Sequence, residues 1–356
     1  MKRTALIMAG GRGERFWPRS RKQLPKQFLS LTDDGKTMIQ LTVERIRPLT
    51  EAEDIYISTN RDYLPLVREQ LPEIPEDNII CEPVGRNTAP CIALCAALIQ
   101  NRYEDALMMV LPSDHLIRYS GMYQQTLQDA CEVAEQGDNL VTVGITPDHA
   151  ETGYGYIKFT NDAAIGRAFR VERFVEKPSL EKAKEYLAAD DYLWNSGMFL
   201  WKISSIMKRF EELMPDVFTG AQKIRSAYAN GTGEEALQKI FPEFPSISID
   251  YGIMERSQNI YTIPGTFGWD DVGSWLAVER IKKSNEAGNI VNGNAITIDT
   301  KNCIIQAENK LIATVGLKDL IIVDTEDATL ICDKESTADI KKILENLKIC
   351  NRNEYL

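Results

Sequence analysis

The sequence predicts an α/β fold in which a Rossmann-like, mostly parallel sheet is followed by a small β-rich domain. Two observations predict this fold. Up to residue 284, apolar strand-like runs alternate with segments of helical periodicity, as in parallel sheets covered by helices on both faces. From residue 285, short apolar runs follow one another at spacings of 8 or 9 residues. We therefore expect a large domain over 1–284 and a small domain over 285–356.

The large domain is expected to contain five central strands, separated by helices. The strand-like runs cover 4–8, 54–58, 78–81, 106–111 and 140–144. The helical segments between them cover 37–47, 61–70, 90–100 and 121–135. Cys91 and Cys95, four residues apart, should lie on the buried face of the third helix. Loops that leave the carboxyl ends of such strands form the ligand crevice of an open α/β sheet, so we expect the binding residues there.

The small domain contains short apolar runs with no helices between them. They are centred on Ile296, Ile304, Ile312, Ile321 and Leu330. Evenly spaced short strands of this kind are typical of a β-helix coil or a small meander. The final stretch, 336–348, has the pattern of an amphipathic helix, and Ser336 is its expected cap.

Charge and hydropathy exclude several classes of function. With a formal net charge of −11, the chain is poorly suited to bind nucleic acid or an anionic membrane. No apolar run approaches the ~20 residues of a membrane span, and the N-terminal residues lack a small-residue cleavage site. Seven cysteines without a C-x-x-C pair fit a reducing compartment. We expect a cytoplasmic protein whose anionic ligand is small.

A glycine-rich loop directly follows the first strand. Its glycines are Gly10, Gly11 and Gly13. Without side chains at these positions, backbone N–H groups can turn toward an anion, and Arg12, Arg15 and Lys26 add positive charge. The loop lacks the G-K-[ST] ending of a Walker loop and the spacing of the dinucleotide fingerprint. The pattern predicts a phosphate-binding loop of a different kind, whereas a plain tight turn would not require Arg15 or Lys26.

Seven motifs occur in order along the chain. They are Gly10-Gly11-x-Gly13-x-Arg15-Phe16-x-Pro18 with Pro25-Lys26-Gln27, Glu82-Pro83-x-x-Arg86-Asn87-Thr88-Ala89-Pro90, and the segments 111–115, 153–156, 174–178, 194–199 and 269–275. Together they resemble the motifs of the sugar-phosphate nucleotidyltransferases, most closely those of the mannose-1-phosphate guanylyltransferases.

The resemblance implies a reaction and a partner. It implies transfer of GMP from GTP to α-D-mannose 1-phosphate, which yields GDP-mannose and pyrophosphate. Family members carry a small left-handed β-helix-like domain at this position and often use it in oligomer contacts, so a homodimer through that domain is expected. Some bacterial relatives extend further into an isomerase domain, which we do not expect within these 356 residues.

Asp114 and Asp271 are the candidate metal ligands. Mg²⁺ prefers carboxylate, water and phosphate oxygens, and one or two carboxylates completed by the substrate are a common arrangement. Asp114 follows a strand, although an aspartate there could also cap a helix. Asp270 could face the ion in place of Asp271, but the resemblance favours Asp271. The sequence has two histidines, and neither belongs to a recognisable base or metal cluster.

Residues that handle the sugar phosphate are expected in the second half of the large domain. Lys177 is a point charge suited to the 1-phosphate, and Glu176 can accept hydrogen bonds from sugar hydroxyls. Asn195 offers both a donor and an acceptor, and Gly155 permits close approach of the backbone to a ring. Glu-Lys-Pro alone is also a common surface turn, and the surrounding motifs favour the functional interpretation.

Base and ribose recognition is expected around Glu82. One carboxylate can accept both N1–H and N2–H₂ of guanine, a donor pair that adenine and the pyrimidines lack. A structural role for Glu82 is an equal alternative. Asn87 and Thr88 could bind ribose or phosphate, or could cap the helix that follows them. Arg86 could contact phosphate or form an ion pair.

Three other functions stay open at this point. The substrate could be another sugar 1-phosphate or another triphosphate. A non-catalytic nucleotide-sugar sensor of the same fold is a second alternative, although sensors tend to lose the arginine, lysine and aspartate residues found here. A nicotinamide-dependent dehydrogenase is the general expectation for the fold, and the glycine spacing disfavours it.

Overall fold

The computed structural model describes residues 1–11 and 13–356, with Ala163 described by its backbone alone. Two compact units divide the chain. The first, here called the sheet unit, comprises Met1–Gly10, Thr42–Ser113 and Ile117–Trp269. The second, here called the β-helix unit, comprises Gly11–Leu41, Asp114–Leu116 and Asp270–Leu356. The domain boundary between residues 284 and 285 stays a prediction, because compactness alone does not decide which segments fold as a domain.

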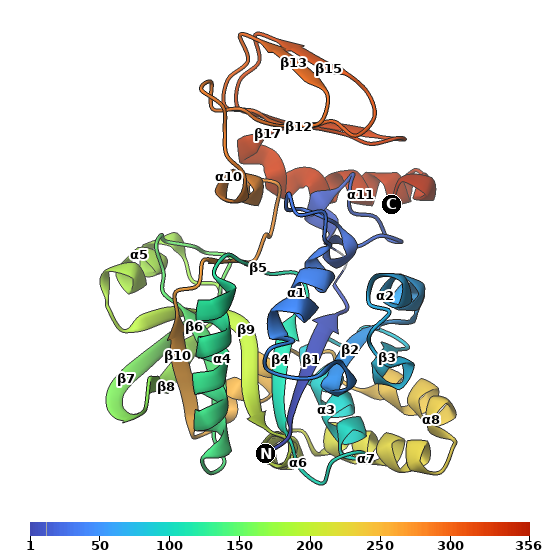
Figure 1. Ribbon diagram of the computed structural model, residues 1–356, viewed down its shortest axis with the longest axis vertical. Coiled ribbons are helices and arrows are strands. Elements are labelled where there is room, and N and C mark those ends of the chain that lie inside the picture. Colours follow the sequence, from blue (N-terminus) through green and yellow to red (C-terminus); the bar gives the residue numbers. More distant parts are fainter. Residues whose placement is uncertain (12) are drawn as a thin grey trace. The chain divides into compact units, whose positions relative to one another are not determined.

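The sheet unit is built on one mixed sheet (Figure 1), whose strand order is β3-β2-β1-β4-β9-β6-β10-β8-β7. Within the described residues, β8 and β9 run against the direction of the other strands, so the sheet is mostly parallel. The strands are β1 (Arg3–Ala9), β2 (Ile55–Asn60), β3 (Ile79–Glu82), β4 (Leu107–Pro112), β6 (Leu140–Ile145), β7 (Tyr156–Ile165), β8 (Ala168–Val175), β9 (Tyr192–Lys202) and β10 (Ile260–Gly265). The predicted α/β fold is confirmed, and each predicted central strand is present.

Helices cover both faces of this sheet. Helix α4 contacts β4, β6, β9 and β10 on one face, whereas α3 and α6 pack on the other and α7 packs on them. The helices are α2 (Leu64–Gln70), α3 (Thr88–Ile99), α4 (Ser120–Glu135), α5 (Leu180–Ala188), α6 (Ile203–Leu213), α7 (Pro215–Ala229), α8 (Gly233–Ile240) and α9 (Ile249–Gly252). Helix α3 is apolar all round because it is buried on most sides, and Cys91 and Cys95 lie inside as predicted.

Three elements cross from one unit into the other along the chain. They are α1 (Met38–Ile46), β5 (Leu116–Ile117) and β11 (Trp269–Asp270). The predicted helix over 37–47 corresponds to α1, and the predicted helix over 61–70 begins as a 3-10 turn before α2. None of the described helices is long and apolar enough to cross a membrane.

Short parallel strands form coils in the β-helix unit. Strands β12, β14 and β16 pair side by side in one small sheet, and β13 and β15 pair in a second. Successive strands thus alternate between two faces, as in a β-helix, and β17 closes the first sheet in the antiparallel direction. The strands are β12 (Ile290–Asn292), β13 (Ala295–Ile298), β14 (Ile304–Gln306), β15 (Ile312–Val315), β16 (Leu320–Asp324) and β17 (Thr329–Asp333). Of the two forms expected from the 8- and 9-residue spacing, a β-helix coil and a small meander, the β-helix coil is the one present.

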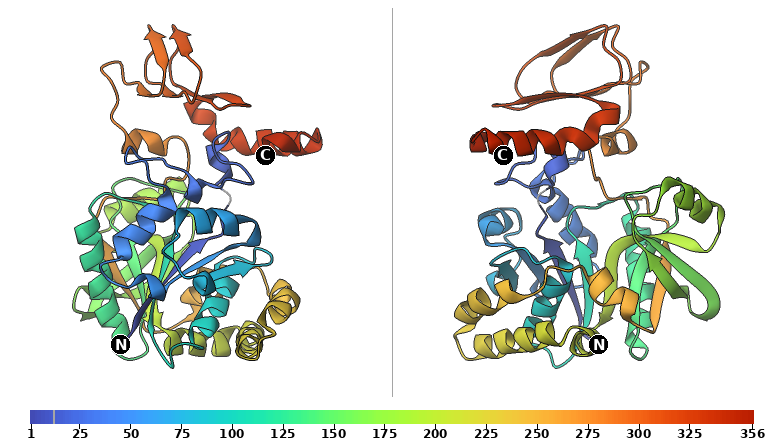
Figure 2. Two further views of the ribbon diagram at one scale, coloured as in Figure 1. Left: turned by 45° about the vertical axis from the view of Figure 1, so that its right-hand side comes forward. Right: turned by 180° about the vertical axis from the view of Figure 1, so that it is seen from behind.

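The core of the β-helix unit joins its N-terminal and C-terminal segments. Phe16 and Trp17 pack in one apolar cluster with Trp275, with β-helix strands, and with Ile340 and Leu344 of the last helix, α11 (Ile340–Ile349). Figure 2 shows α11 in red beside the blue segment that carries the short helix η1 (Glu14–Phe16), and the two are in contact. Helix α10 (Ala277–Ile281) belongs to the same unit.

The predicted cap of the last helix is wrong. Asp333, not Ser336, accepts a hydrogen bond from the backbone N–H of Glu335, at 2.8 Å. Ser336 lies inside the 3-10 helix η8 (Lys334–Asp339), which precedes α11. The helical segment begins two residues earlier than predicted, so its cap lies earlier as well.

Candidate active site

The β-helix unit contains an open cavity of about 410 Å³ lined by charged side chains. Four predicted catalytic residues line it, and Gly13 of the glycine-rich loop and Lys341 of α11 line it with them. The four are Arg15, Lys26, Asp114 and Asp271. They come from three segments that are far apart in the sequence, so the fold brings these predicted residues together.

Lys26 connects the two candidate metal ligands. Its Nζ lies 2.9 Å from Oδ2 of Asp114 and donates to the carbonyl oxygen of Asp271 at 2.5 Å. The Lys26 side chain is buried, so the surrounding protein atoms fix the position of its ammonium group. Gly13 makes the packing feasible, because its φ is +60° and a Cβ there would stand 2.3 Å from the Cβ of Lys26.

Asp114 is suited to ionise at neutral pH. Burial alone would raise the pKa of Asp114, but the charge of Lys26, together with His115 and the hydrogen bonds, lowers it. A carboxylate must be deprotonated to bind a metal, so the lowered pKa fits a ligand role. Across residues 1–11 and 13–356 the structure has no cluster of three or more acidic, histidine or cysteine side chains arranged for a metal. Two carboxylates in an open cavity fit an ion that is completed by water and substrate oxygens.

The neighbouring carboxylates Asp270 and Asp271 have different surroundings. Asp270 is buried and accepts two hydrogen bonds from Arg280 and one from the N–H of Val272. Asp271 lines the cavity, and its Oδ1 accepts from the N–H of Gly273 at 3.1 Å. Directly after Asp271, Val272 has a φ of +49°, a conformation that β-branched residues rarely adopt. Such backbone strain occurs mainly at functional loops, and here it lies in the turn that follows the two aspartates.

The predicted sugar-phosphate residues gather in the sheet unit. The backbone N–H of Asn195, in β9, donates a hydrogen bond to the carbonyl oxygen of Gly155 at 2.8 Å. A Cβ on Gly155 would come within 2.5 Å of Oε2 of Glu176. The absence of a side chain at Gly155 therefore lets the carboxylate of Glu176 approach the backbone closely, and the three residues form one cluster.

Lys177 extends from the same cluster into solvent. Its Nζ lies 3.0 Å from Oε1 of Glu176, and 65% of its side chain is exposed. Its φ of +44° is unusual for a lysine and turns the chain sharply before Pro178. The ammonium group is therefore presented on a strained turn, close to the carboxylate proposed to contact the sugar.

Asp250 is a member of this cluster that the sequence analysis missed. The side-chain amide of Asn195 donates to Oδ1 of Asp250 at 2.7 Å. Burial raises the pKa of Asp250 and the nearby Glu176 carboxylate raises it further, while the bond from Asn195 acts in the opposite direction. Asp250 lies on α9, and the cluster thus combines two carboxylates and one cation with a polar amide.

Glu82 lies at the end of β3 and is buried. Its Oε1 accepts a hydrogen bond from Oγ of Ser58 at 2.8 Å, and the thiol of Cys91 lies 3.2 Å from the same Ser58 hydroxyl. Burial raises the pKa of Glu82, and the Ser58 and Cys91 contacts offset this only in part. A buried carboxylate with one hydroxyl partner retains unused acceptor capacity, which fits a role in binding donors.

The residues after Glu82 make contacts that shape the loop and the helix behind it. Asn87 caps α3 through the N–H of Thr88, and the Thr88 hydroxyl accepts from the N–H of Ile249 at 2.8 Å. Arg86 donates to the carbonyl of Pro242, and its buried Nε has no partner among the described residues. The capping alternative for Asn87 is therefore realised, and ligand contacts by these three residues stay predictions.

The glycine-rich loop divides between the two units. Gly10 directly follows β1, and the carbonyl of Gly11 accepts from Nε2 of Gln27 at 3.0 Å. No protein atom would obstruct a Cβ on Gly10 or Gly11, so their role in close approach to a ligand stays a prediction. Arg12, the predicted nucleotide-binding arginine, lies outside the described residues.

Comparison with known proteins identifies the family of this chain. A model of the family "Nucleotidyl transferase" matches residues 4–287, and a model of the "MannoseP isomerase/GMP-like beta-helix domain" matches residues 293–347. A mannose-1-phosphate guanylyltransferase of Escherichia coli (strain K12) is 41% identical over 98% of this chain and 74% of its own length. One of Salmonella muenchen is 42% identical over 98% of this chain and 74% of its own length.

Solved structures show the same relationship. A crystal structure from Thermus thermophilus, described as a mannose-1-phosphate geranyltransferase, has a TM-score of 0.88 and 32% identity and covers 98% of this chain and 100% of its own. A mannose-6-phosphate isomerase structure from Helicobacter pylori has a TM-score of 0.61 and 28% identity, with 76% and 100% covered. By its sequence and its fold, this chain belongs to the nucleotidyl transferase family, within the group of the mannose-1-phosphate guanylyltransferases.

Proposed function

We propose that this protein transfers GMP from GTP to α-D-mannose 1-phosphate and releases pyrophosphate. An oxygen of the sugar phosphate attacks the α-phosphorus of GTP, and the bond from that phosphorus to the bridging β-phosphate oxygen breaks in line with the attack. The electron pair leaves on pyrophosphate, and GDP-mannose is formed. The observation that carries the proposal is the cavity that unites Arg15, Lys26, Asp114 and Asp271.

The cationic residues of the cavity address the main barrier, which is the approach of two anions. Arg15 is exposed in the cavity and makes no ion pair with any residue that the structure describes. It is therefore available to bind phosphate oxygens, and its planar guanidinium suits bidentate contact with them. Lys26 binds near the α-phosphate and holds Asp114 in place. No covalent enzyme intermediate is required, because positioning and charge stabilisation suffice for phosphoryl chemistry.

Asp114 and Asp271 are proposed to hold Mg²⁺. The supporting observation is their donor set, two carboxylates on one open cavity, with Lys26 bonded to the carboxylate of Asp114 and to the backbone carbonyl of Asp271. A bound Mg²⁺ neutralises charge on the phosphate oxygens and on the leaving group. The two carboxylates and Lys26 fix the place at which the α-phosphate is bound.

The sugar phosphate is proposed to bind at the cluster of Gly155, Glu176, Lys177 and Asn195. Lys177 provides the charge for the 1-phosphate. Glu176 and Asn195 form hydrogen bonds with ring hydroxyls, and Gly155 leaves room for the ring. Support comes from the contacts of Asn195 and the close approach of Glu176 to Gly155.

Glu82 is proposed to accept the N1–H and N2–H₂ donors of guanine. Its burial and the single hydroxyl bond that it accepts support this role, because a desolvated carboxylate gains most from two donors. Gly10, Gly11, Arg12 and Gly13 are proposed to contact the phosphates. Arg86, Asn87 and Thr88 are proposed to line the ribose and phosphate side of the nucleotide site, in addition to their contacts within the fold.

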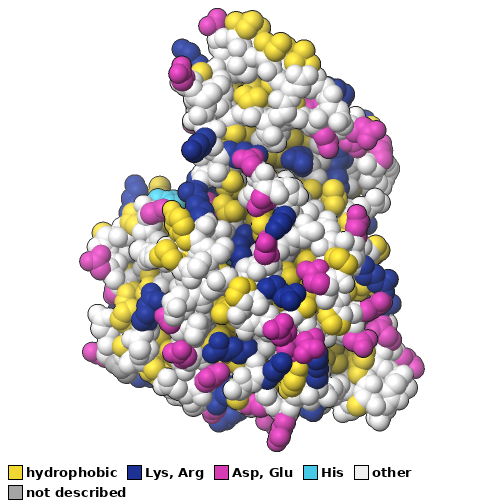
Figure 3. Space-filling view, in the orientation of Figure 1, with side chains coloured by type: hydrophobic (Ala, Val, Ile, Leu, Met, Phe, Trp, Pro, Cys, Tyr) yellow, Lys and Arg dark blue, Asp and Glu magenta, His cyan; other side chains and the backbone are white. Residues whose placement is uncertain are grey.

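A second copy of the chain is the proposed partner of the β-helix coils. Ile296, Ile298, Leu311 and Val315 are all more than half exposed, and Figure 3 shows hydrophobic side chains along the edge formed by β13 and β15, at the top of the view. Ile298 and Val315 are neighbours in the paired strands. Sedimentation of the parent and of Ile298→Glu tests this proposal, since loss of a dimer is expected in the variant. We also propose a cytoplasmic location and a domain boundary after residue 284.

Release of pyrophosphate from GTP and mannose 1-phosphate, with and without Mg²⁺, tests the function directly. We expect activity that requires the metal and exceeds the activity with ATP, UTP or glucose 1-phosphate. Higher activity with another sugar 1-phosphate would favour the alternative substrate. Binding of GDP-mannose without turnover would favour a sensor, although the retained Arg15, Lys26, Asp114 and Asp271 argue for an enzyme.

A further inference from the structure

The last helix of the chain contributes a side chain to the cavity that contains the candidate catalytic residues. Lys341, the second residue of α11, lines that cavity with Arg15, Lys26, Asp114 and Asp271. All of these residues belong to the β-helix unit, so their placement relative to one another is described within one compact unit. No other residue after 273 lines this cavity among those described.

Packing fixes the orientation of α11 in this position. Ile340 and Leu344 are buried in the cluster that contains Phe16 and Trp17, and α11 contacts η1, which carries Arg15. Lys341 directly follows the buried Ile340, so it lies in the first turn of α11, and this turn is next to the cavity. The position of Lys341 therefore depends on a packed core and not on a mobile surface segment.

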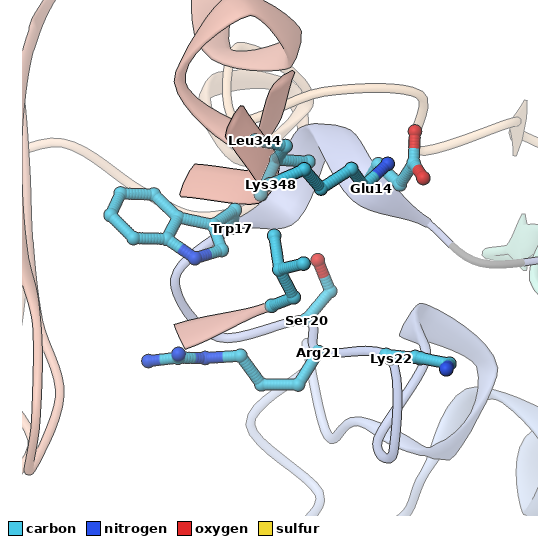
Figure 4. Close-up of a pocket in the computed structure, with 8 residues that line it drawn as sticks. Glu14, Trp17, Ser20, Arg21, Lys22, Leu344 and Lys348 are labelled. Atoms are coloured by element: carbon cyan, nitrogen blue, oxygen red, sulfur yellow. The ribbon is translucent and has the colours of Figure 1, made fainter. Parts of the chain in front are cut away.

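A second lysine on the same face of α11 confirms how the helix faces the loop. Lys348 lies seven residues after Lys341, about two helical turns, and lines a neighbouring pocket with Leu344 and Glu14. Figure 4 shows the Lys348 side chain extended toward Glu14 of η1. The carbonyl of Tyr355 accepts from Nε1 of Trp17 at 2.7 Å and from Nη1 of Arg21 at 2.8 Å. The C-terminal segment is thus tied to the loop along its length.

Lys341 is a cation without an acidic partner. Among the described residues, no carboxylate lies within ion-pair distance of it, whereas its neighbour Lys342 pairs with Asp339 at 2.9 Å. Lys26 is already engaged by Asp114 and by the backbone of Asp271. Arg15 and Lys341 are therefore the cavity cations that are left to neutralise an additional anion.

We propose that Lys341 binds the β- and γ-phosphates of GTP, which leave as pyrophosphate. This inference rests on the proposed function and deepens it. The α-phosphate belongs beside Lys26 and the two carboxylates, and the outer phosphates carry most of the charge of the triphosphate. An exposed ammonium at the rim of the same cavity suits them, and it stabilises the charge that grows on the leaving group. The C-terminal helix would then take part in catalysis directly.

Lys341→Met tests the proposal, with Lys342→Met as the matched control one residue away. In the reverse reaction, from GDP-mannose and pyrophosphate, we expect the KM for pyrophosphate to rise roughly ten- to a hundredfold in Lys341→Met. The KM for GDP-mannose should change little, because GDP-mannose lacks the departing phosphates. Lys341→Arg should keep most of the affinity, and Lys342→Met should resemble the parent. An unchanged KM for pyrophosphate in Lys341→Met would overturn the proposal.

Calorimetric binding of inorganic pyrophosphate separates this inference from the proposed function. If the parent binds pyrophosphate and Lys341→Met does not, the assignment of Lys341 holds even for a protein without guanylyltransferase activity. If both proteins bind it equally, the assignment is wrong whatever the activity. A parent that binds neither pyrophosphate nor GTP would overturn both proposals. Equal melting temperatures of the variants show that folding is not the cause.

Discussion

Arg280 donates two hydrogen bonds to the carboxylate of Asp270, the one from Nη2 at 2.9 Å, while the adjacent Asp271 lines the charged cavity. Two consecutive aspartates thus differ in their surroundings, and Val272, which follows them, has a φ of +49°. Asp270 is occupied by an ion pair and a backbone N–H. Asp271 is the carboxylate placed to meet a ligand.

Asp271→Asn and Asp114→Asn should therefore lose activity through weaker metal binding. Removing one charge from a two-carboxylate site is expected to cost at least roughly 10- to 100-fold in metal affinity or turnover. Titration of the rate with Mg²⁺ measures the effect, and the required Mg²⁺ concentration should rise in both variants. Near-normal turnover of Asp271→Asn at limiting Mg²⁺ would contradict the assignment.

Asp270→Asn is the matched control, and it should act on stability rather than on the metal. The variant replaces the buried carboxylate that pairs with Arg280 by a neutral amide, which costs about 1 kcal/mol or more. We expect a lower melting temperature and an unchanged dependence on Mg²⁺. A large rise in the required Mg²⁺ concentration would instead place Asp270 at the ion.

Lys177→Ala should raise the requirement for the sugar phosphate and leave that for GTP unchanged. Loss of a charge-assisted contact is worth about 1.5 to 3 kcal/mol, roughly ten- to a hundredfold in kcat/KM for mannose 1-phosphate. Lys184→Ala, at an exposed position on α5, is the control. If Lys177→Ala weakened GTP binding and spared the sugar phosphate, the proposed division of the site would be incorrect.

Asp250→Ala should impair use of the sugar through Asn195. The Asp250 carboxylate accepts the Asn195 amide at 2.7 Å and so fixes which of its polar atoms face the ligand. Without that acceptor, we expect a lower kcat and a higher KM for mannose 1-phosphate, at an unchanged KM for GTP. Asp250→Asn keeps an acceptor and should recover most of the activity. A purely structural role would lower the melting temperature and leave the ratio of the two KM values unchanged.

The sequence predicted the local parts of the site and could not predict the parts made by distant contacts. The glycine-rich loop follows β1 as a continuous pattern, so Arg15 and Lys26 were found. Asp250 lies 55 residues from its partner Asn195 in a segment without a repeating pattern, and only the folded chain joins them. Lys341 has the sequence context of the solvent face of an amphipathic helix, and its cavity arises from packing on η1.

Similar reasoning explains the error at the last helix. Ser336 satisfies the preference for a hydroxyl residue before an apolar periodic run. A 3-10 turn extends the helical segment toward the N-terminus, and Asp333 then lies where a cap is required. Local preference identified the type of element correctly, and the local cap at Asp333 lies three residues before the expected one.

Glu82 provides a test in which stability and base recognition should change in opposite directions. Burial raises the pKa of Glu82 above its ordinary value. A carboxyl group with a raised folded-state pKa contributes stability below its unfolded pKa, and that contribution is lost as the pH rises through the folded pKa. The charged side chain therefore costs stability at neutral pH. Glu82→Gln should raise the melting temperature at pH 7, and the difference from the parent should shrink as the pH falls.

The same variant should lose discrimination between GTP and ITP, which lacks the N2 amino group. A glutamine must turn its amide N–H toward one guanine donor, and a buried polar group left unpaired costs about 1 to 3 kcal/mol. Since the parent uses both donors and the variant only one, the ratio of kcat/KM for GTP to that for ITP should fall. A more stable Glu82→Gln with an unchanged ratio would mean that backbone groups select the base. A less stable variant would mean that Glu82 serves the fold through Ser58.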